Sequence, residues 1–127
     1  MEIKVGGYVR TKLGIAKLIE TRLERKEKEY YFDKPVSTYE SHFEFDYINE
    51  LFEEDLENII EKSSPNIIDL IEVGDYVNGH KVIYTIGDIN KKIYVEYVNM
   101  SELLEIKLEQ IASIVTKEQF KEMEYRL

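Results

Sequence analysis

Apolar and polar residues alternate over short runs in the first 39 residues, and turn-forming residues separate the runs. Alternation with a period of two is typical of strands that are buried on one face. A tight turn at Lys12-Leu13-Gly14 and a run of charged residues over 24–28 interrupt the pattern, as hairpin connections do. The pattern therefore predicts three strands, over residues 8–11, 15–23 and 29–33.

Residues 64–127 show the same kind of pattern with clearer turn signals. Asn78-Gly79 is the strongest two-residue hairpin signal in the chain. Thr116 and Gln119 have the spacing of a capping box, which predicts the start of a helix. The elements predicted in this half are strands over 80–86, 93–98, 105–115 and 125–127 and a short helix from 117 to about 123.

Residues 40–62 change to a helical period. Apolar side chains recur at spacings of three and four positions, as they do on the buried face of an amphipathic helix. These side chains are Tyr47, Ile48, Leu51, Phe52, Leu56, Ile59 and Ile60. Asp55 falls toward the apolar side. The opposite face of the predicted helix carries Glu50, Glu53, Glu54, Glu57 and Glu61.

A five-residue pattern, V-G-x-Y-V, occurs twice, at 5–9 and at 73–77. The order of elements after the first copy, and the order strand, helical turn, terminal strand at the end of the chain, are typical of SH3-like barrels. We therefore predict a mainly β protein with one substantial helix, in which two SH3-like small-barrel lobes are joined by an acidic helical segment. A core shared by both lobes is the alternative, because the first lobe is short for an independent barrel. The predicted boundaries are an N-terminal lobe over 1–39, an acidic helical connector over 40–63 and a C-terminal lobe over 64–127.

Charge is unevenly distributed along the chain, whose net charge is −9. Residues 1–28 carry eight Lys or Arg against four Glu, whereas residues 40–61 carry nine Asp or Glu and no Lys or Arg. Direct nucleic-acid binding by the basic first segment is the weaker hypothesis, because the field of the whole chain repels phosphate. The chain has no Cys and no apolar run near the ~20 residues that span a bilayer, so we expect a soluble cytoplasmic protein.

The residues of an active site are not evident in the sequence. His42 and His80 lie 38 positions apart in different predicted elements, and one imidazole among carboxylates is a weak metal signal. The chain contains no phosphate-binding loop, no G-x-G-x-x-G and no G-x-S-x-G. We therefore expect no enzyme activity, no cofactor and no metal.

The acidic face of the predicted helix is the candidate binding site. Its carboxylates recur at spacings comparable with those of phosphates along a nucleic-acid strand, so the segment is a candidate nucleic-acid mimic for the basic groove of a partner. An ordinary solvated helix face is the alternative, although i,i+4 Glu–Lys pairs would then be favoured and are lacking. The predicted partner-binding residues are Glu50, Glu53, Glu54, Glu57 and, as the weakest member, Asp55.

The chain carries V-G-D-Y-V-N-G at 73–79, within a longer run from Ser64, and I-V-T-K-E-Q-F at 114–120. With these motifs, and with V-G-x-Y-V-R-T-K near its start, it resembles small uncharacterised proteins from phages and prophages of Firmicutes. The resemblance implies a viral context and brings no catalytic residue. The acidic centre and the hairpin over 89–98 depart from it.

From this resemblance, the small size and the acidic face, we expect a non-enzymatic, phage-encoded binding protein that inhibits a host protein. A defence nuclease is the partner that such a face fits, in the manner of anti-CRISPR proteins. The alternative is a structural or scaffolding SH3-like module in a phage protein assembly. The sequence leaves the identity of the partner and the oligomeric state open.

Overall fold

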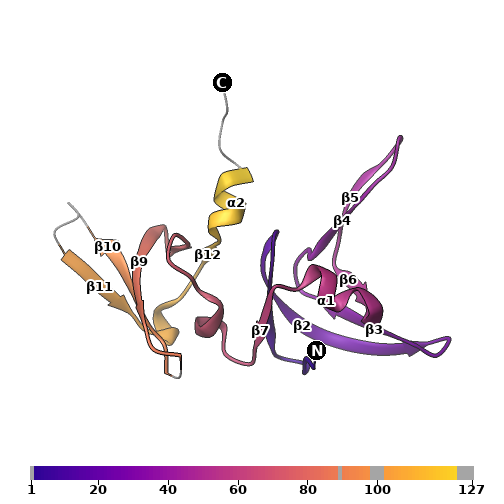
Figure 1. Ribbon diagram of the computed structural model, residues 1–127, viewed down its shortest axis with the longest axis horizontal. Coiled ribbons are helices and arrows are strands. Elements are labelled where there is room, and N and C mark those ends of the chain that lie inside the picture. The colour runs from indigo at the N-terminus through magenta and orange to yellow at the C-terminus, as the bar shows by residue number, and fades with distance from the viewer. Residues whose placement is uncertain (1, 89, 98–101, 123–127) are drawn as a thin grey trace. The chain divides into compact units, whose positions relative to one another are not determined.

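The computed structural model describes residues 2–88, 90–97 and 102–122 and is mainly β (Figure 1). It divides into two compact units, residues 1–70 (unit 1) and 71–127 (unit 2). Each unit has a five-stranded antiparallel sheet of its own.

Unit 1 contains seven strands, and its main sheet has the order β6-β3-β2-β1-β7, while β4 and β5 pair only with each other. The strands are β1 (Tyr8–Thr11), β2 (Gly14–Glu24), β3 (Glu27–Phe32), β4 (Ser37–Glu40), β5 (Phe45–Ile48), β6 (Glu50–Phe52) and β7 (Lys62–Ser64). The helical elements are the 3-10 helices η1 (Glu53–Asp55) and η2 (Ile67–Leu70) and the short α-helix α1 (Leu56–Ile59).

Unit 2 has a sheet of the order β11-β10-β9-β8-β12. Its strands are β8 (Tyr76–Val77), β9 (His80–Ile86), β10 (Lys92–Tyr97), β11 (Glu102–Ile106) and β12 (Ile114–Val115). Its helical elements are η3 (Leu108–Gln110) and α2 (Lys117–Glu122).

The two sheets share one topology. In each unit four strands follow one another across the sheet in chain order, and the last strand returns to pair with the first. In each unit a helical turn lies between the fourth and the fifth of these strands: η1 and α1 in unit 1, and η3 in unit 2. Unit 1 differs by the additional hairpin β4–β5, which lies between its third and fourth sheet strands.

The first copy of V-G-x-Y-V forms a turn that leads into β1. The amide of Gly7 donates a hydrogen bond to the carbonyl of Lys4 at 2.9 Å, and Gly6 has a φ of 92°. A positive φ at this position is that of a type II turn, which favours glycine because a Cβ would strain the backbone. The carbonyl of Gly7 then accepts the amide of Leu18 at 2.9 Å, so the turn is tied to β2.

The second copy forms the same turn before β8. The amide of Asp75 donates to the carbonyl of Glu72 at 3.1 Å, and Gly74 has a φ of 98°. The carbonyl of Asp75 accepts the amide of Val82 at 2.7 Å, which ties this turn to β9. The repeated sequence therefore has one structural role in both units: it makes the turn that begins the sheet.

Each unit buries its own apolar side chains, as expected for sheets with one covered face. The core of unit 1 consists of Ile3, Val9, Ala16, Leu18, Tyr30, Phe32, Val36, Leu51, Leu56 and Ile60. The buried apolar side chains of unit 2, among the described residues, are Ile71, Val77, Val82, Ile93, Val95 and Ile106.

The local turn and capping signals are confirmed. Asn78 and Gly79 have φ values of 52° and 82° and join β8 to β9. Thr116 Oγ1 accepts the amide of Gln119 at 3.3 Å, and the Gln119 side chain accepts the amide of Thr116 at 2.9 Å, which is the predicted capping box. The strand predicted over 105–115 is wrong in its middle, where η3 separates β11 from β12. The strand predicted over 125–127 lies outside the described residues.

The long helix predicted over 40–62 is wrong for most of its length. Residues 45–48 and 50–52 are strands, and only residues 53–59 are helical. The apolar spacing has a different origin: Leu51 is buried because β6 pairs with β3, with Leu51 opposite Tyr30, whereas Tyr47 is exposed on β5. Cross-strand pairing with β3, far away in sequence, thus outweighed a local pattern that fits a helix.

Closure of the two predicted barrels is not seen either. The main sheet of unit 1 ends at β6 and β7, and that of unit 2 ends at β11 and β12. Among the described residues, the terminal strands of each sheet pair on one side only, so both sheets are open.

Candidate interaction surface

The predicted binding residues lie on two different elements of unit 1. Glu53, Glu54 and Asp55 form η1, and Glu57 follows in α1. Glu50 belongs to strand β6 instead. The structure therefore keeps four of the five predicted residues in one short helical turn and places the fifth on the sheet.

The helical turn 53–59 is held in place by its apolar side. Leu56 is buried, with 1% of its surface exposed, and Ile60 follows it into the core. Glu53, Glu54 and Glu57 are exposed, whereas Asp55 is half-buried, as the predicted position toward the apolar side implies. The carboxylates of this turn therefore project from a well-anchored element.

Glu50 belongs to a mixed-charge face of the sheet. It lies opposite Tyr31 on β3, whose hydroxyl donates a hydrogen bond to the carboxylate of Glu29. This hydrogen bond, together with desolvation and the negative charges of Glu29 and Glu50, raises the pKa of Tyr31 to about 12. A carboxylate that accepts from a neutral phenol would repel the phenolate, so Tyr31 stays protonated to high pH.

The same face contains an ion pair on β2. The guanidinium of Arg22 donates to the carboxylate of Glu20 at 2.9 Å and lies 4.8 Å from the ring centroid of Tyr31. The hydrogen bond from Arg22 lowers the pKa of Glu20. Arg22 is thus a cation close to the acidic groups around Tyr31. The sequence between Pro35 and Glu61, in contrast, contains no Lys or Arg.

Exposure of the acidic segment (residues 40–61) is nearly complete. Eight of its nine Asp and Glu residues are exposed, and Asp55 is the half-buried exception. Three of the eight, Glu40, Glu44 and Asp46, belong to the β4–β5 hairpin and its turn. The negative charge is therefore divided among the hairpin, strand β6 and the helical turn with Glu61 just after it, and is not spaced along one helix face.

The β4–β5 hairpin is the functional candidate that sequence reasoning missed. Figure 1 shows it extending from the rest of unit 1. Tyr39, Phe45 and Tyr47 on its strands are each more than half exposed, and Phe43 in its turn is 96% exposed. The period-two alternation of Phe45, Asp46 and Tyr47 was the signal that could have indicated a strand here.

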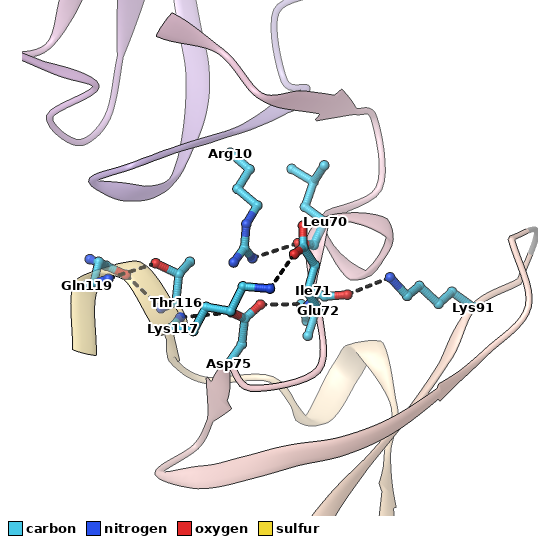
Figure 2. Close-up of polar contacts among 9 residues, drawn as sticks. All are labelled: Arg10, Leu70, Ile71, Glu72, Asp75, Lys91, Thr116, Lys117 and Gln119. Carbon is cyan, nitrogen blue, oxygen red and sulfur yellow. Dashed lines mark hydrogen bonds and ion pairs between the residues drawn. The ribbon is translucent and has the colours of Figure 1, made fainter. Parts of the chain in front are cut away.

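Buried polar side chains are the other place where chemistry could reside, and in unit 2 they have structural roles. Asp75 is fully buried; its carboxylate accepts the amide of Glu72 at 2.7 Å and the amide of Lys117 at 2.9 Å (Figure 2). The ammonium group of Lys117 also donates to the Glu72 carboxylate at 2.8 Å. These contacts join the turn before β8 to the start of α2. In unit 1, the buried Arg10 donates to the carbonyl of Leu70 at 2.9 Å.

Neither histidine lies in a metal-binding cluster. His42 is exposed in the turn of the β4–β5 hairpin, and His80 is half-buried at the start of β9 with its ring 5.9 Å from that of Tyr97. Within residues 2–88, 90–97 and 102–122, no three His, Asp or Glu side chains are placed to hold a metal ion. In the same residues, no helix has the length and apolar character needed to cross a membrane.

Comparison with known proteins gives no information about this site, so only its geometry bears on its function. No model of a protein family, no curated protein and no solved structure matches the chain. The geometry offers two exposed acidic elements: the hairpin β4–β5, which also carries exposed aromatic side chains, and the helical turn 53–59. Surfaces of this kind bind partners through charge and aromatic contacts.

Proposed function

We propose that the chain is a non-enzymatic binding protein whose acidic segment occupies a basic surface of a partner protein. The observation that carries the proposal is the exposure of eight carboxylates between Glu40 and Glu61, a stretch without Lys or Arg. Such a surface attracts Lys and Arg side chains and accelerates association with a basic partner. It also repels nucleic acid, which is why the partner is a protein.

The resemblance to phage and prophage proteins gives this proposal its specific form. A protein that binds nucleic acid presents a groove lined by Lys and Arg, and a carboxylate-bearing segment competes with phosphate for those side chains. The specific proposal is therefore inhibition of a host protein, such as a defence nuclease, in the manner of anti-CRISPR proteins. The mimicry is one of charge: the carboxylates come from a hairpin, a strand and a helical turn.

The shared topology of the two units supports an SH3-like origin for both. In each, the fifth strand returns to the first, and a helical turn precedes that fifth strand, which is the order of elements in an SH3-like barrel. The open sheets of unit 1 and unit 2 are in this proposal departures from the closed form. The SH3-like sheets serve as a scaffold, and unit 1 presents the acidic segment on it.

The test uses a variant that removes charge and keeps shape. Glu53→Gln, Glu54→Gln and Glu57→Gln together leave the buried Leu56 untouched, so the melting temperature should hardly change. Partners captured from a Firmicutes lysate are identified by mass spectrometry, purified and measured for association rate. We expect the variant to associate markedly more slowly at low salt, and the difference to shrink as ionic strength rises.

A matched control carries the same change in net charge elsewhere. Glu24→Gln, Glu102→Gln and Glu109→Gln remove three exposed carboxylates that lie outside the acidic segment. If this control slows association as much as the first variant does, net charge alone explains the effect and the acidic segment is not the binding site. If neither variant slows association, charge mimicry is refuted.

A structural or scaffolding module in a phage protein assembly is the second candidate function. It is favoured by apolar side chains that are exposed on the sheet of unit 2, namely Ile83, Tyr84, Ile86, Leu103 and Leu104. Apolar contacts respond little to salt, so an assembly held by these side chains should persist at high ionic strength. Binding that survives high salt and is lost in a Leu103→Ser/Leu104→Ser variant would favour this candidate.

A further inference from the structure

The β4–β5 hairpin is an addition to the topology that the two units share. In unit 1, residues 33–49 connect the third and fourth sheet strands, β3 and β6. In unit 2, residues 98–101 connect the corresponding strands, β10 and β11. Reversal of the chain therefore does not require so long a connection. The base of the hairpin contributes Val36 to the core of unit 1, but the exposed side chains toward its tip have no such role.

The register of the hairpin separates its side chains onto two faces. Thr38 pairs with Tyr47, and Glu40 with Phe45, so these four side chains share one face. The rings of Phe45 and Tyr47 contact each other edge to face, with centroids 5.3 Å apart. Tyr39 lies on the opposite face and is also more than half exposed. Aromatic side chains thus point to solvent from both faces.

An ordered turn holds the tip of the hairpin. The amide of Ser41 donates to the carbonyl of Glu44 at 2.8 Å, and the Ser41 hydroxyl accepts the amides of Phe43 at 3.3 Å and Glu44 at 3.1 Å. These bonds define the backbone on both sides of Phe43, whose ring is the most exposed large apolar side chain among the described residues. A defined backbone that presents a solvent-exposed phenyl ring is a pre-organised anchor for a pocket.

The charge of the hairpin indicates which kind of binding partner could cover these aromatic rings. Glu40, Glu44 and Asp46 lie beside the aromatic side chains, and residues 37–48 contain no Lys or Arg. A second copy of the hairpin would bring like charges together, and an anionic membrane or a nucleic acid would repel it. A protein surface with Lys or Arg around an apolar cleft satisfies both the rings and the carboxylates.

We infer that the β4–β5 hairpin is the anchor of the complex, and that it inserts Phe43, Phe45 and Tyr47 into an apolar cleft flanked by Lys or Arg on the partner protein. The inference rests on the proposed function, because it names the contact that holds the same basic partner. In this division of roles the acidic segment accelerates association, and the aromatic tip slows dissociation.

The first test places a photo-crosslinker at the tip. The full chain carries p-benzoyl-phenylalanine in place of Phe43, and a control chain carries it in place of Leu23, which is exposed near the tip of the β2–β3 hairpin. After irradiation in a Firmicutes lysate, mass spectrometry identifies the crosslinked peptides. We expect the probe at position 43 to label one folded protein at peptides that combine apolar residues with Lys or Arg. Labelling of the same sites from position 23, or none from position 43, would refute the inference.

The second test compares ring removal with charge removal on the purified partner. Phe43→Ser/Phe45→Ser/Tyr47→Ser keeps every charge, and the Glu53, Glu54 and Glu57 to Gln variant keeps every ring. We expect the ring variant to weaken binding by at least about 30-fold through faster dissociation, the loss typical of a hot spot. Leu23→Ser is the matched control for removal of an exposed apolar side chain and should leave the affinity unchanged.

The two variants distinguish failure of the inference from failure of the proposed function. If only the charge variant weakens binding, the basic partner stands and the hairpin is not its anchor. If neither variant weakens binding, both proposals fail. Crosslinking of position 43 to a second copy of this chain, or flotation of the chain with phosphatidylglycerol vesicles that depends on the three rings, would likewise overturn the inference in favour of self-association or a membrane.

Discussion

Replacement of Asp75 by alanine is the sharpest test of how unit 2 is held together. The side chain is fully buried, and its two oxygens each accept a backbone amide, that of Glu72 at 2.7 Å and that of Lys117 at 2.9 Å. In the alanine variant both amides lose their acceptor inside the protein. The turn before β8 and the start of α2 then lose two of the hydrogen bonds that join them, and the ion pair of Lys117 with Glu72 remains (Figure 2).

The expected magnitude follows from the number and type of these hydrogen bonds. A hydrogen bond to a charged group contributes about 1.5–3 kcal/mol, and a buried amide left without an acceptor costs a similar amount. Two such bonds predict that Asp75→Ala lowers the free energy of unfolding by about 3–6 kcal/mol. This is a large share of the roughly 5–15 kcal/mol of a typical domain, so the variant should be close to unfolding in unit 2.

The measurement is urea denaturation of the full chain, followed by the NMR signals of amides in both units. Asp75→Asn keeps one acceptor oxygen and should cost about half as much as the alanine variant. Asp88→Ala, which removes an exposed carboxylate of the same unit, should change stability by less than about 0.5 kcal/mol. A loss below about 1 kcal/mol for Asp75→Ala would show that the two amides find other acceptors and would refute the reasoning.

Three further predictions concern unit 1. In a spectrophotometric titration, Tyr31 should ionise near pH 12, and Glu29→Gln should lower its pKa toward 10. Because the folded-state pKa of Tyr31 is raised, its contribution to stability is present below pH 10 and is lost as the pH rises through about 12. Arg25 and Lys26 have φ values of 50° and 69°, so Arg25→Asn/Lys26→Gly should raise the urea midpoint by the equivalent of about 1–2 kcal/mol, and an unchanged midpoint would contradict the positive-φ turn. Gly6→Ala should cost about 1–2 kcal/mol in the same assay through backbone strain alone, since a Cβ there would meet no atom within 4 Å.

Local signals in the sequence predicted the parts of the fold that local chemistry controls. The Asn78-Gly79 turn, the capping box of Thr116 and Gln119, and the charged hairpin tip at Arg25 and Lys26 all lie where they were predicted. Each depends on residues within a few positions of one another. The repeated V-G-x-Y-V also has one role in both units, because its turn and strand are encoded by adjacent residues.

The prediction failed where distant pairing decides the structure. Leu51 and Leu56 are both buried and lie five positions apart, a spacing that is compatible with a helix that has a broad apolar face. In the structure, however, Leu51 is buried because β6 pairs with β3, and Leu56 is buried on a helical turn. The sequence pattern within residues 40–62 gives no information about the position of β3. The predicted binding residues were affected in the same way: Glu53, Glu54 and Glu57 lie together on a helical turn, whereas Glu50 lies on the sheet.

The shared topology also indicates where a specific function is encoded. In unit 2, four residues of the sequence lie between its third and fourth sheet strands, β10 and β11, and seven lie between β11 and β12. In unit 1 the corresponding connections, residues 33–49 and 53–61, hold eight of the nine acidic residues of the acidic segment and all of the exposed aromatic side chains of the hairpin. Charge and aromatic surface are therefore concentrated in the parts of unit 1 that unit 2 builds with fewer residues. The fold of unit 2 shows that a sheet of this order forms without such a surface, and partner binding is the role that we propose for it.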